Sequence, residues 1–259
     1  MSFIIDNNII KASLLDIPHG FSTRLGGVSE GIFATMNLGP SRGDNPEYVR
    51  ENFRRFCGEA GCDDTRVVAT RQVHGSYVHQ VGEADAGDMF MRGAPCDCDG
   101  LMTDTAGVSL VIFSADCIPV LLYDPKKRVI AAVHAGWRGT AAKIPAEAVQ
   151  RMGIAYGTRP EDVHAAIGPG ISACCFHTDA DVPEAMPWAG EHIKTIGAER
   201  FSVDLKAANR QALMETGVPP TQIAVNGACT MCRSDLFWSH RKTQGQRGSM
   251  AAVIMLPEV

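Results

Sequence analysis

The chain has 259 residues, of which 45% are hydrophobic and 20% charged, a composition typical of a globular protein with a sizeable core. Its formal net charge of −5 argues against general nucleic-acid binding, which needs a basic surface, and no apolar run reaches the roughly 18 residues of a membrane span. Nine cysteines without a recognisable export signal favour free thiols or metal ligands in a reducing cytoplasm. We therefore expect a cytoplasmic protein with one catalytic domain over residues 1–259.

The first part of the chain alternates predicted strands with loops. Apolar runs predict strands at Phe3–Ile5 and Ile9–Leu14, and a glycine-rich loop follows at Ser22–Gly31 and carries Arg24. Asn45-Pro46 then predicts a helix start, because Asn caps a helix well and Pro suits its first position.

The next segment predicts two short strands that flank a turn. Arg66–Val73 and Tyr77–Val81 are the predicted strands, and His74 lies between them. Residues 82–100 form a loop rich in Gly, Asp and Ala, and Leu101–Thr103 predicts another short strand.

Three apolar, β-branched runs predict the centre of the fold. The first is Val108–Phe113, and the other two, Ile118–Tyr123 and Arg128–His134, flank the turn sequence Asp-Pro-Lys-Lys. Proline suits the second position of such a turn, so we expect an antiparallel hairpin.

The hairpin predicts a pair of neighbouring side chains. If Asp124 faces Lys127 at the turn, Cys117 lies opposite His134, and partners in such a pair have Cβ atoms about 4.5–5.5 Å apart. A slip of one residue would break this pairing. Pro119 cannot donate a hydrogen bond, so this end of the strand is expected at an edge or to be irregular.

The remaining elements mix helices and strands. In chain order we expect a helix at Gly139–Gly153, a strand at Val163–Ile167, a short helix at Asp179–Met186, a helix at Leu205–Thr216 capped by Asp204, a strand at Gln222–Val225, and strands at Phe237–Ser239 and Met250–Leu256 joined by a basic, glycine-rich loop. This mixture with hairpins favours an α+β fold over a doubly wound parallel sheet.

A metal centre is the chemistry that these elements indicate most strongly. A catalytic zinc usually has three protein ligands and one open position. Cys117 and His134 supply two ligands by the register argument, and His74, between a strand and a glycine, is the best third candidate. Alternatively, His134 hydrogen-bonds at a strand end, Cys117 is a small buried apolar residue, or Cys117 is a nucleophile with His134 as its base.

Other cysteines offer a competing metal site. Cys229 and Cys232 form a CxxC pair, which Cys96 and Cys98 would complete as a four-thiolate structural zinc site. Only one of these pairs has the regular spacing, so this alternative carries less weight. The adjacent pair at 174–175 is expected to serve packing.

Several motifs together resemble one protein family. They are STRLGGVS, RQVHG, DCDG, SADCIP, HAGWRGT, IGPGI, CTMC and FWSHR, and they extend over residues 20–245. The chain thereby resembles the zinc-dependent purine nucleoside phosphorylases, a family also described as laccase-like polyphenol oxidases and, in part, as peptidoglycan editing factors.

The resemblance implies a four-layer α/β/β/α sandwich with mixed, largely antiparallel sheets. It also implies one zinc held by His74, Cys117 and His134, phosphorolysis of adenosine, inosine or guanosine, adenosine deamination and cleavage of methylthioadenosine. One departure is that the family often has an aromatic residue followed by Glu-Val after IGP-x-I, where this chain has Phe176-His177-Thr178.

The activity needs acids and anion-binding groups beside the metal. Zinc lowers the pKa of bound water to about 7, which would supply the nucleophile for deamination at C6 of adenine. Zinc deaminases add a carboxylate for proton transfer, and we expect Asp99, Asp116 or the neighbouring Asp97 in this role, with Cys117 as the remaining catalytic residue. The expected contacts to phosphate or ribose are Arg24, Asn37, Arg71, Arg138 and Arg241, because a guanidinium binds phosphate through two hydrogen bonds.

Three other functions stay open. A copper-dependent polyphenol oxidase would need clustered histidines, and the eight histidines are scattered, so copper is less expected than zinc. A hydrolase that removes L-serine from a UDP-muramoyl peptidoglycan precursor would use Cys117 or zinc-activated water. A non-enzymatic binding module is the third. The oligomeric state is open, and purine nucleoside and phosphate are the expected partners.

Overall fold

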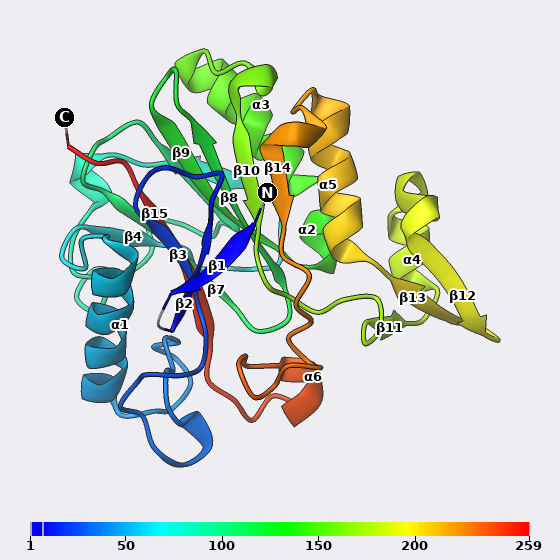
Figure 1. Ribbon diagram of the computed structural model, residues 1–259, viewed down its shortest axis with the longest axis horizontal. Coiled ribbons are helices and arrows are strands. Elements are labelled where there is room, and N and C mark those ends of the chain that lie inside the picture. The colour runs from blue at the N-terminus through cyan, green and yellow to red at the C-terminus, as the bar shows by residue number, and fades with distance from the viewer. Residues whose placement is uncertain (1, 7, 259) are drawn as a thin grey trace.

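Two six-stranded sheets form the centre of the computed structural model, which describes residues 2–6 and 8–258 (Figure 1). In spatial order the first sheet contains β1 (Phe3–Asp6), β2 (Ile9–Ala12), β3 (His19–Ser22), β15 (Met250–Met255), β7 (Ser109–Ser114) and β4 (Val67–Ala69). The second contains β14 (Ile223–Val225), β10 (His164–Ile167), β8 (Ile118–Asp124), β9 (Val129–Ala135), β6 (Gly100–Thr103) and β5 (Val78–Gln80). Within the two sheets three pairs, β4–β7, β5–β6 and β10–β14, are parallel, and the other pairs are antiparallel.

Helices and a small third sheet surround this centre. The small sheet contains β11 (His177–Thr178), β13 (Arg200–Val203) and β12 (Ile193–Gly197) and lies at the periphery beside α4 (Figure 1). The helices are α1 (Pro46–Ala60), α2 (Trp137–Ala141), α3 (Ile144–Tyr156), α4 (Asp181–Ala185), α5 (Leu205–Thr216) and α6 (His240–Thr243). Every helix in the described ranges is too short or too polar to cross a bilayer.

The core lies in three interfaces between four layers. Helix α1 packs Phe53 on the first sheet, the two sheets face each other through residues such as Ile112 and Leu121, and α3 and α5 pack Val149 and Leu213 on the second sheet. Both faces of the central strands are covered, which explains their continuous apolar sequences. The predicted α+β class and α/β/β/α layering are confirmed.

The hairpin register differs from the prediction by two residues. Pro119, not Cys117, lies opposite His134 in the β8–β9 pair. The loop is longer than predicted because Arg128 adopts the left-handed conformation, with φ of 54°, and the strands close at Asp124. Side chains alternate with a period of two, so this shift keeps Cys117 on the side of His134, whereas a shift of one would not.

Three other predicted elements differ from the structure. The helix expected at Gly139–Gly153 is divided into α2 and α3 at Lys143, which has a φ of 55°, and Pro145 lies in the first turn of α3. Phe237–Ser239 is irregular and not a strand, and its Phe and Trp side chains are buried in the core between the sheets. The predicted strand at Arg66–Val73 is reduced to β4, and the chain then leaves the sheet toward His74.

Candidate metal centre and active site

Three side chains from separate segments converge at one end of the second sheet. His74 follows β4, Cys117 precedes β8 and His134 lies in β9, and one ligand atom of each lies within 4.8 Å of the others. Cys117 Sγ is 3.9 Å from His74 Nε2, and the two imidazole rings are nearly perpendicular, with centroids 5.0 Å apart. The structure thus brings together the three residues expected to hold a metal.

Local backbone geometry makes this convergence possible. His74 and Asp116 adopt left-handed conformations, with φ of 60° and 90°, which turn the chain sharply before Gly75 and before Cys117. Gly136 leaves room beside the ligands, since a Cβ there would lie 3.0 Å from His74 Cδ2 and 3.3 Å from Cys117 Sγ. The ligand cluster therefore depends on a residue without a side chain at position 136.

Asp99 holds two of the three ligands from behind. Its fully buried carboxylate accepts hydrogen bonds from the backbone N–H groups of Val73 (3.1 Å), His74 (3.0 Å) and Gly75 (2.7 Å). It also lies 2.8 Å from His134 Nδ1, which leaves Nε2 of that ring free to bind a metal. A carboxylate in this position orients a ligating histidine and raises its basicity.

The charges of these groups are strongly coupled. Burial raises the pKa of the Cys117 thiol, but His134 and His74 outweigh it and bring the pKa down to about 6. Burial lowers the pKa of His134, while Cys117 and Asp99 raise it to about 9. Burial also opposes ionisation of Asp99, yet His134 and the amide of Gly75 lower its pKa overall. A thiolate beside an imidazolium is a site where a cation can replace a proton.

The donor set fits a zinc ion. One thiolate and two imidazoles are common zinc ligands, and a site with three protein ligands keeps one position for water or substrate. Asp99 also hydrogen-bonds His134 Nδ1 and so holds the ring with its Nε2 available to a metal. His74, Cys117 and His134 all line a cavity of about 810 Å³, so a metal held there would be accessible to a small molecule.

The cavity also has a strongly basic wall. Arg42, His240, Arg241 and Arg247 line it together with the metal-ligand candidates. Arg247 is only 8% exposed, and its Nε is buried without a hydrogen-bond partner among the described residues. Burial and the charge of Arg42 lower the pKa of Arg247 to about 10. Clustered guanidinium groups with an unsatisfied donor are suited to an anion such as phosphate.

Asp116 joins the two sides of the cavity. Its Oδ1 accepts a hydrogen bond from Thr230 Oγ1 at 2.6 Å, and its Oδ2 accepts from Ser239 Oγ at 3.1 Å and from the Arg241 backbone N–H at 2.7 Å. This carboxylate therefore connects the turn that carries Cys117 to the start of α6, next to the basic wall.

Two of the predicted substrate contacts lie in the cavity. Arg71 lines it and pairs with Asp97 at the surface. Arg241 lines it too, and its Nη1 donates to the carbonyl of His177 at 3.0 Å while its guanidinium lies over the Phe176 ring.

The other three predicted contacts are not among the residues that line the cavity. Arg24 donates to the carbonyls of Ser234 and Ala34, at 3.0 and 2.9 Å, and stacks on Trp238. Asn37 is fully buried and fixes its own loop, and Arg138 stacks on the neighbouring Trp137 ring. These side chains make the contacts named here with the protein itself, and their role in binding substrate stays a prediction. Asp99 is likewise behind the cavity wall and not on it.

Sequence reasoning missed most of the basic wall. Arg42, Arg92, His240 and Arg247 line the cavity but were not predicted. For Arg247 the available signal is the basic, glycine-rich loop that follows FWSHR, whereas Arg42 and Arg92 lie in separate loops of the chain. Which cations of the basic loop face inward depends on the turn of α6, and spacing does not reveal that.

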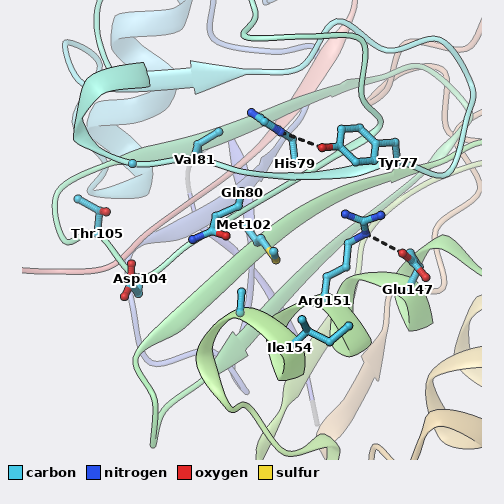
Figure 2. A pocket seen from close by; sticks show the side chains of 12 residues that line it. Tyr77, His79, Gln80, Val81, Met102, Asp104, Thr105, Glu147, Arg151 and Ile154 are labelled. Carbon is cyan, nitrogen blue, oxygen red and sulfur yellow. Dashed lines mark hydrogen bonds and ion pairs between the residues drawn. The ribbon is translucent and has the colours of Figure 1, made fainter.

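A second hollow of about 740 Å³ lies between α3 and the edge strand β5 (Figure 2). Its polar groups satisfy one another: the Tyr77 hydroxyl hydrogen-bonds His79 Nδ1 at 3.1 Å, and Arg151 pairs with Glu147 at 2.6 Å and lies against the Tyr77 ring. None of the predicted site residues lines this hollow. We therefore place the candidate site in the cavity that contains His74.

Comparisons with known proteins place the chain in the family that its sequence motifs resemble. Residues 18–257 match the family described as "Multi-copper polyphenol oxidoreductase laccase". The chain is 41% identical over 250 residues to "Purine nucleoside phosphorylase" of Deinococcus radiodurans, which covers 96% of this chain and 93% of that protein. It is 37% identical over 248 residues to "Purine nucleoside phosphorylase YlmD" of Geobacillus stearothermophilus, with 91% and 88% covered.

Solved structures share the fold. The crystal structure of YlmD from Geobacillus stearothermophilus superposes with a TM-score of 0.93 at 34% identity and 99% coverage of both chains. That of the hypothetical protein YfiH from Bacillus licheniformis gives a TM-score of 0.93 at 33% identity, with 98% of both chains covered. The chain therefore belongs to the laccase-like polyphenol oxidoreductase family, as the sequence motifs indicated, and is similar to proteins that are named purine nucleoside phosphorylases.

Proposed function

We propose that this protein is a zinc-dependent purine nucleoside phosphorylase that cleaves adenosine, inosine or guanosine with phosphate. The observation that carries the proposal is the presence, in one cavity, of the His74–Cys117–His134 cluster and a wall of arginines. The names of the similar proteins from Deinococcus and Geobacillus support the same reading.

The basic wall is the proposed phosphate site. Arg42, Arg241 and Arg247 line the cavity and would supply the positive charge that holds the dianion beside the ribose. Fixing phosphate next to the nucleoside turns a bimolecular attack on C1′ into an effectively unimolecular one. Aromatic side chains of the same cavity, Phe113 and Phe176, offer an apolar surface for the purine.

Asp99 and Asp116 are proposed in different roles. Asp99 has all its hydrogen bonds directed to His134 and the backbone around His74, so it would orient ligands rather than carry protons. Asp116 orients the start of α6 and hence Arg241, and it is the carboxylate of the predicted pair that lines the cavity. Asp116 is therefore the candidate for proton transfer in the proposed deamination of adenosine.

Bound zinc would act as a Lewis acid and lower the pKa of a water molecule to about 7. The Cys117 thiolate and the two imidazoles would hold the ion, with Asp99 accepting a hydrogen bond from the His134 Nδ1–H group. The same cavity would admit methylthioadenosine, which differs from adenosine only at the 5′ position. Adenosine deamination and methylthioadenosine cleavage are thus proposed as side activities.

A multicopper oxidase is a weaker proposal despite the family description. Such an enzyme needs several copper ions held by many histidines, and the groups of three or more potential ligands in the described ranges include one with histidine. Metal analysis of the purified protein distinguishes the zinc-dependent phosphorylase from the multicopper oxidase. We expect about one zinc ion at this site, and several copper ions per chain would contradict the proposal.

The activity test combines nucleosides with matched histidine variants. Purified protein with adenosine and phosphate is expected to release adenine, and His134→Ala is expected to abolish release because a ligand is lost. His79→Ala is the control, since His79 lies in the other hollow and contacts Tyr77 (Figure 2). Adenine release that persists in His134→Ala, or that is lost equally in His79→Ala, would contradict the proposal.

A further inference from the structure

Four cysteines outside the active-site cluster come together in the fold. Cys174 and Cys175 follow the turn after β10, and Cys229 and Cys232 lie in the segment between β14 and α6. All four sulfur atoms lie within 4.8 Å of one another. The sequence had suggested the pair at 96 and 98 as the partner of CxxC and had assigned Cys174 and Cys175 to packing, and the structure pairs these four instead.

The sulfur spacing fits a tetrahedral tetrathiolate site. Cys174 Sγ lies 3.7 Å from Cys175 Sγ and 3.6 Å from Cys232 Sγ, and Cys175 Sγ lies 3.4 Å from Cys232 Sγ. A tetrahedral zinc with Zn–S bonds of about 2.3 Å places its sulfurs about 3.8 Å apart. A disulfide would need about 2.05 Å instead. The thiols are thus at the separation of ligands around one ion.

The surroundings supply what a thiolate cluster requires. The backbone N–H of Ser172 donates to Cys229 Sγ at 3.4 Å, which is the kind of contact that stabilises a metal-bound thiolate. Lys206, on α5, is only 4% exposed, and its ammonium group donates to the Ala228 carbonyl at 2.6 Å and to Ser172 Oγ at 3.1 Å.

Lys206 is a buried cation in need of a counter-charge. It takes part in none of the ion pairs found among the described residues, although burying an unpaired charge is costly. Its two hydrogen-bond partners are the residues that flank the cysteine cluster, Ser172 on one side and Ala228 on the other. Four thiolates around a divalent cation carry a net charge of about −2, which would provide the missing counter-charge.

We propose that Cys174, Cys175, Cys229 and Cys232 form a second, structural metal site that binds one Zn²⁺ through four thiolates. Binding would release the thiol protons to solvent and form four Zn–S bonds, without any change in oxidation state. The soft, all-sulfur donor set favours zinc over magnesium, calcium or manganese.

Such a site would brace one wall of the active-site cavity. Phe176, which lines the cavity, follows Cys175 directly, and Thr230, which holds Asp116, lies between Cys229 and Cys232. The two linked segments are more than fifty residues apart in the chain, so the ion would close a long loop beside the active site.

The test is metal content of the full-length protein and of matched variants, purified under reducing conditions and supplied with Zn²⁺. Elemental analysis is expected to give about two zinc ions per chain, and about one in His134→Ala, which keeps the proposed thiolate site. The double variant Cys229→Ser/Cys232→Ser is expected to lose the other ion. Cys96→Ser is the matched control and should keep both, because Cys96 belongs to neither cluster.

Cobalt gives a readout that does not depend on the cysteine variants folding. Metal-free protein and its His134→Ala variant, titrated with Co²⁺, should both show the strong visible and thiolate-to-cobalt charge-transfer bands of a tetrahedral tetrathiolate. Their absence in His134→Ala would overturn the proposal. A metal-free cluster joined by a disulfide in the mass spectrum of non-reduced protein would overturn it as well.

Discussion

Replacing Asp99 by Asn tests whether this buried carboxylate positions the metal ligands. Oδ1 of Asp99 serves His74 N and His134 Nδ1, and Oδ2 serves the amides of Val73 and Gly75. An Asn side chain has the same shape but only one oxygen. Whichever way its amide is oriented, two of the four donors lose their acceptor and face an NH₂ group.

The structure sets the expected magnitude. A buried donor left without a partner costs about 1–3 kcal/mol, so Asp99→Asn is expected to lower the free energy of unfolding by about 2–6 kcal/mol. Loss of the carboxylate behind a ligating histidine is expected to weaken zinc binding by about 10- to 100-fold. Both effects arise at a side chain that is 0% exposed, so solvent does not compensate for them.

The assay is a zinc competition titration against a chelator, combined with urea unfolding of the metal-free protein. Asp97→Asn is the control: this neighbouring carboxylate is 54% exposed and pairs with Arg71, so its loss should change stability by less than about 1 kcal/mol and leave zinc affinity intact. If Asp99→Asn binds zinc as tightly and unfolds at the same urea concentration as the unmodified protein, the positioning role of Asp99 is refuted.

Three further predictions address the ligands and the basic wall. Between the pKa values of about 6 for Cys117 and about 9 for His134, the pair holds one proton, which zinc must displace on binding. The apparent zinc affinity in competition titrations should therefore rise about tenfold per pH unit in this range. A zinc affinity that does not change with pH would contradict the coupling of the two groups. Gly136→Ala should weaken zinc binding because the added Cβ would lie 3.0 Å from His74 Cδ2. Gly58→Ala is the matched control, since a Cβ there meets nothing within 4 Å. Equal zinc affinities of the two variants would refute the role of close packing at Gly136. Arg247→Met should raise the KM for phosphate by about 10- to 100-fold with little change for the nucleoside, whereas Arg138→Met should change neither; an unaltered phosphate KM would remove Arg247 from the anion site.

The sequence predicted the central fold well because its signals are local. Continuous apolar runs identified β7, β8 and β9, and the helix caps at Asn45 and Asp204 were confirmed by side-chain hydrogen bonds to the following amides. The hairpin register could not be predicted, since it depends on the left-handed conformation of Arg128. The prediction that Cys117 lies beside His134 was still correct, because the register error was two residues and side chains alternate between the faces of a strand with a period of two.

The cluster of candidate metal ligands was predictable because sequence motif and strand register indicated the same residues. The arginines of the cavity wall were not, because tertiary packing determines which of them face the cavity. His74 was found from its place between a strand and a glycine, and the structure puts it beside Cys117. Arg24 carries the same charge as Arg247, yet the first stacks on Trp238 and the second faces the cavity. Spacing along the chain does not distinguish an arginine that braces a loop from one that can bind an anion.

The cluster of four cysteines was likewise predictable only in part. The CxxC spacing of Cys229 and Cys232 predicts a metal site, but the close approach of two distant turns determines which cysteines lie beside this pair. The bridge between Gly170 and Cys229 brings these turns together, and it joins residues that no local pattern relates.

The most direct measurement of the central claim is ³¹P NMR of the zinc-loaded protein incubated with adenosine and inorganic phosphate. We expect the phosphate signal to fall while a ribose 1-phosphate signal and adenine appear in equal amounts, and we expect neither product with a His74→Ala/His134→Ala variant. Free ribose with unchanged phosphate, or ribose 1-phosphate formed equally well by the variant, would contradict the central claim.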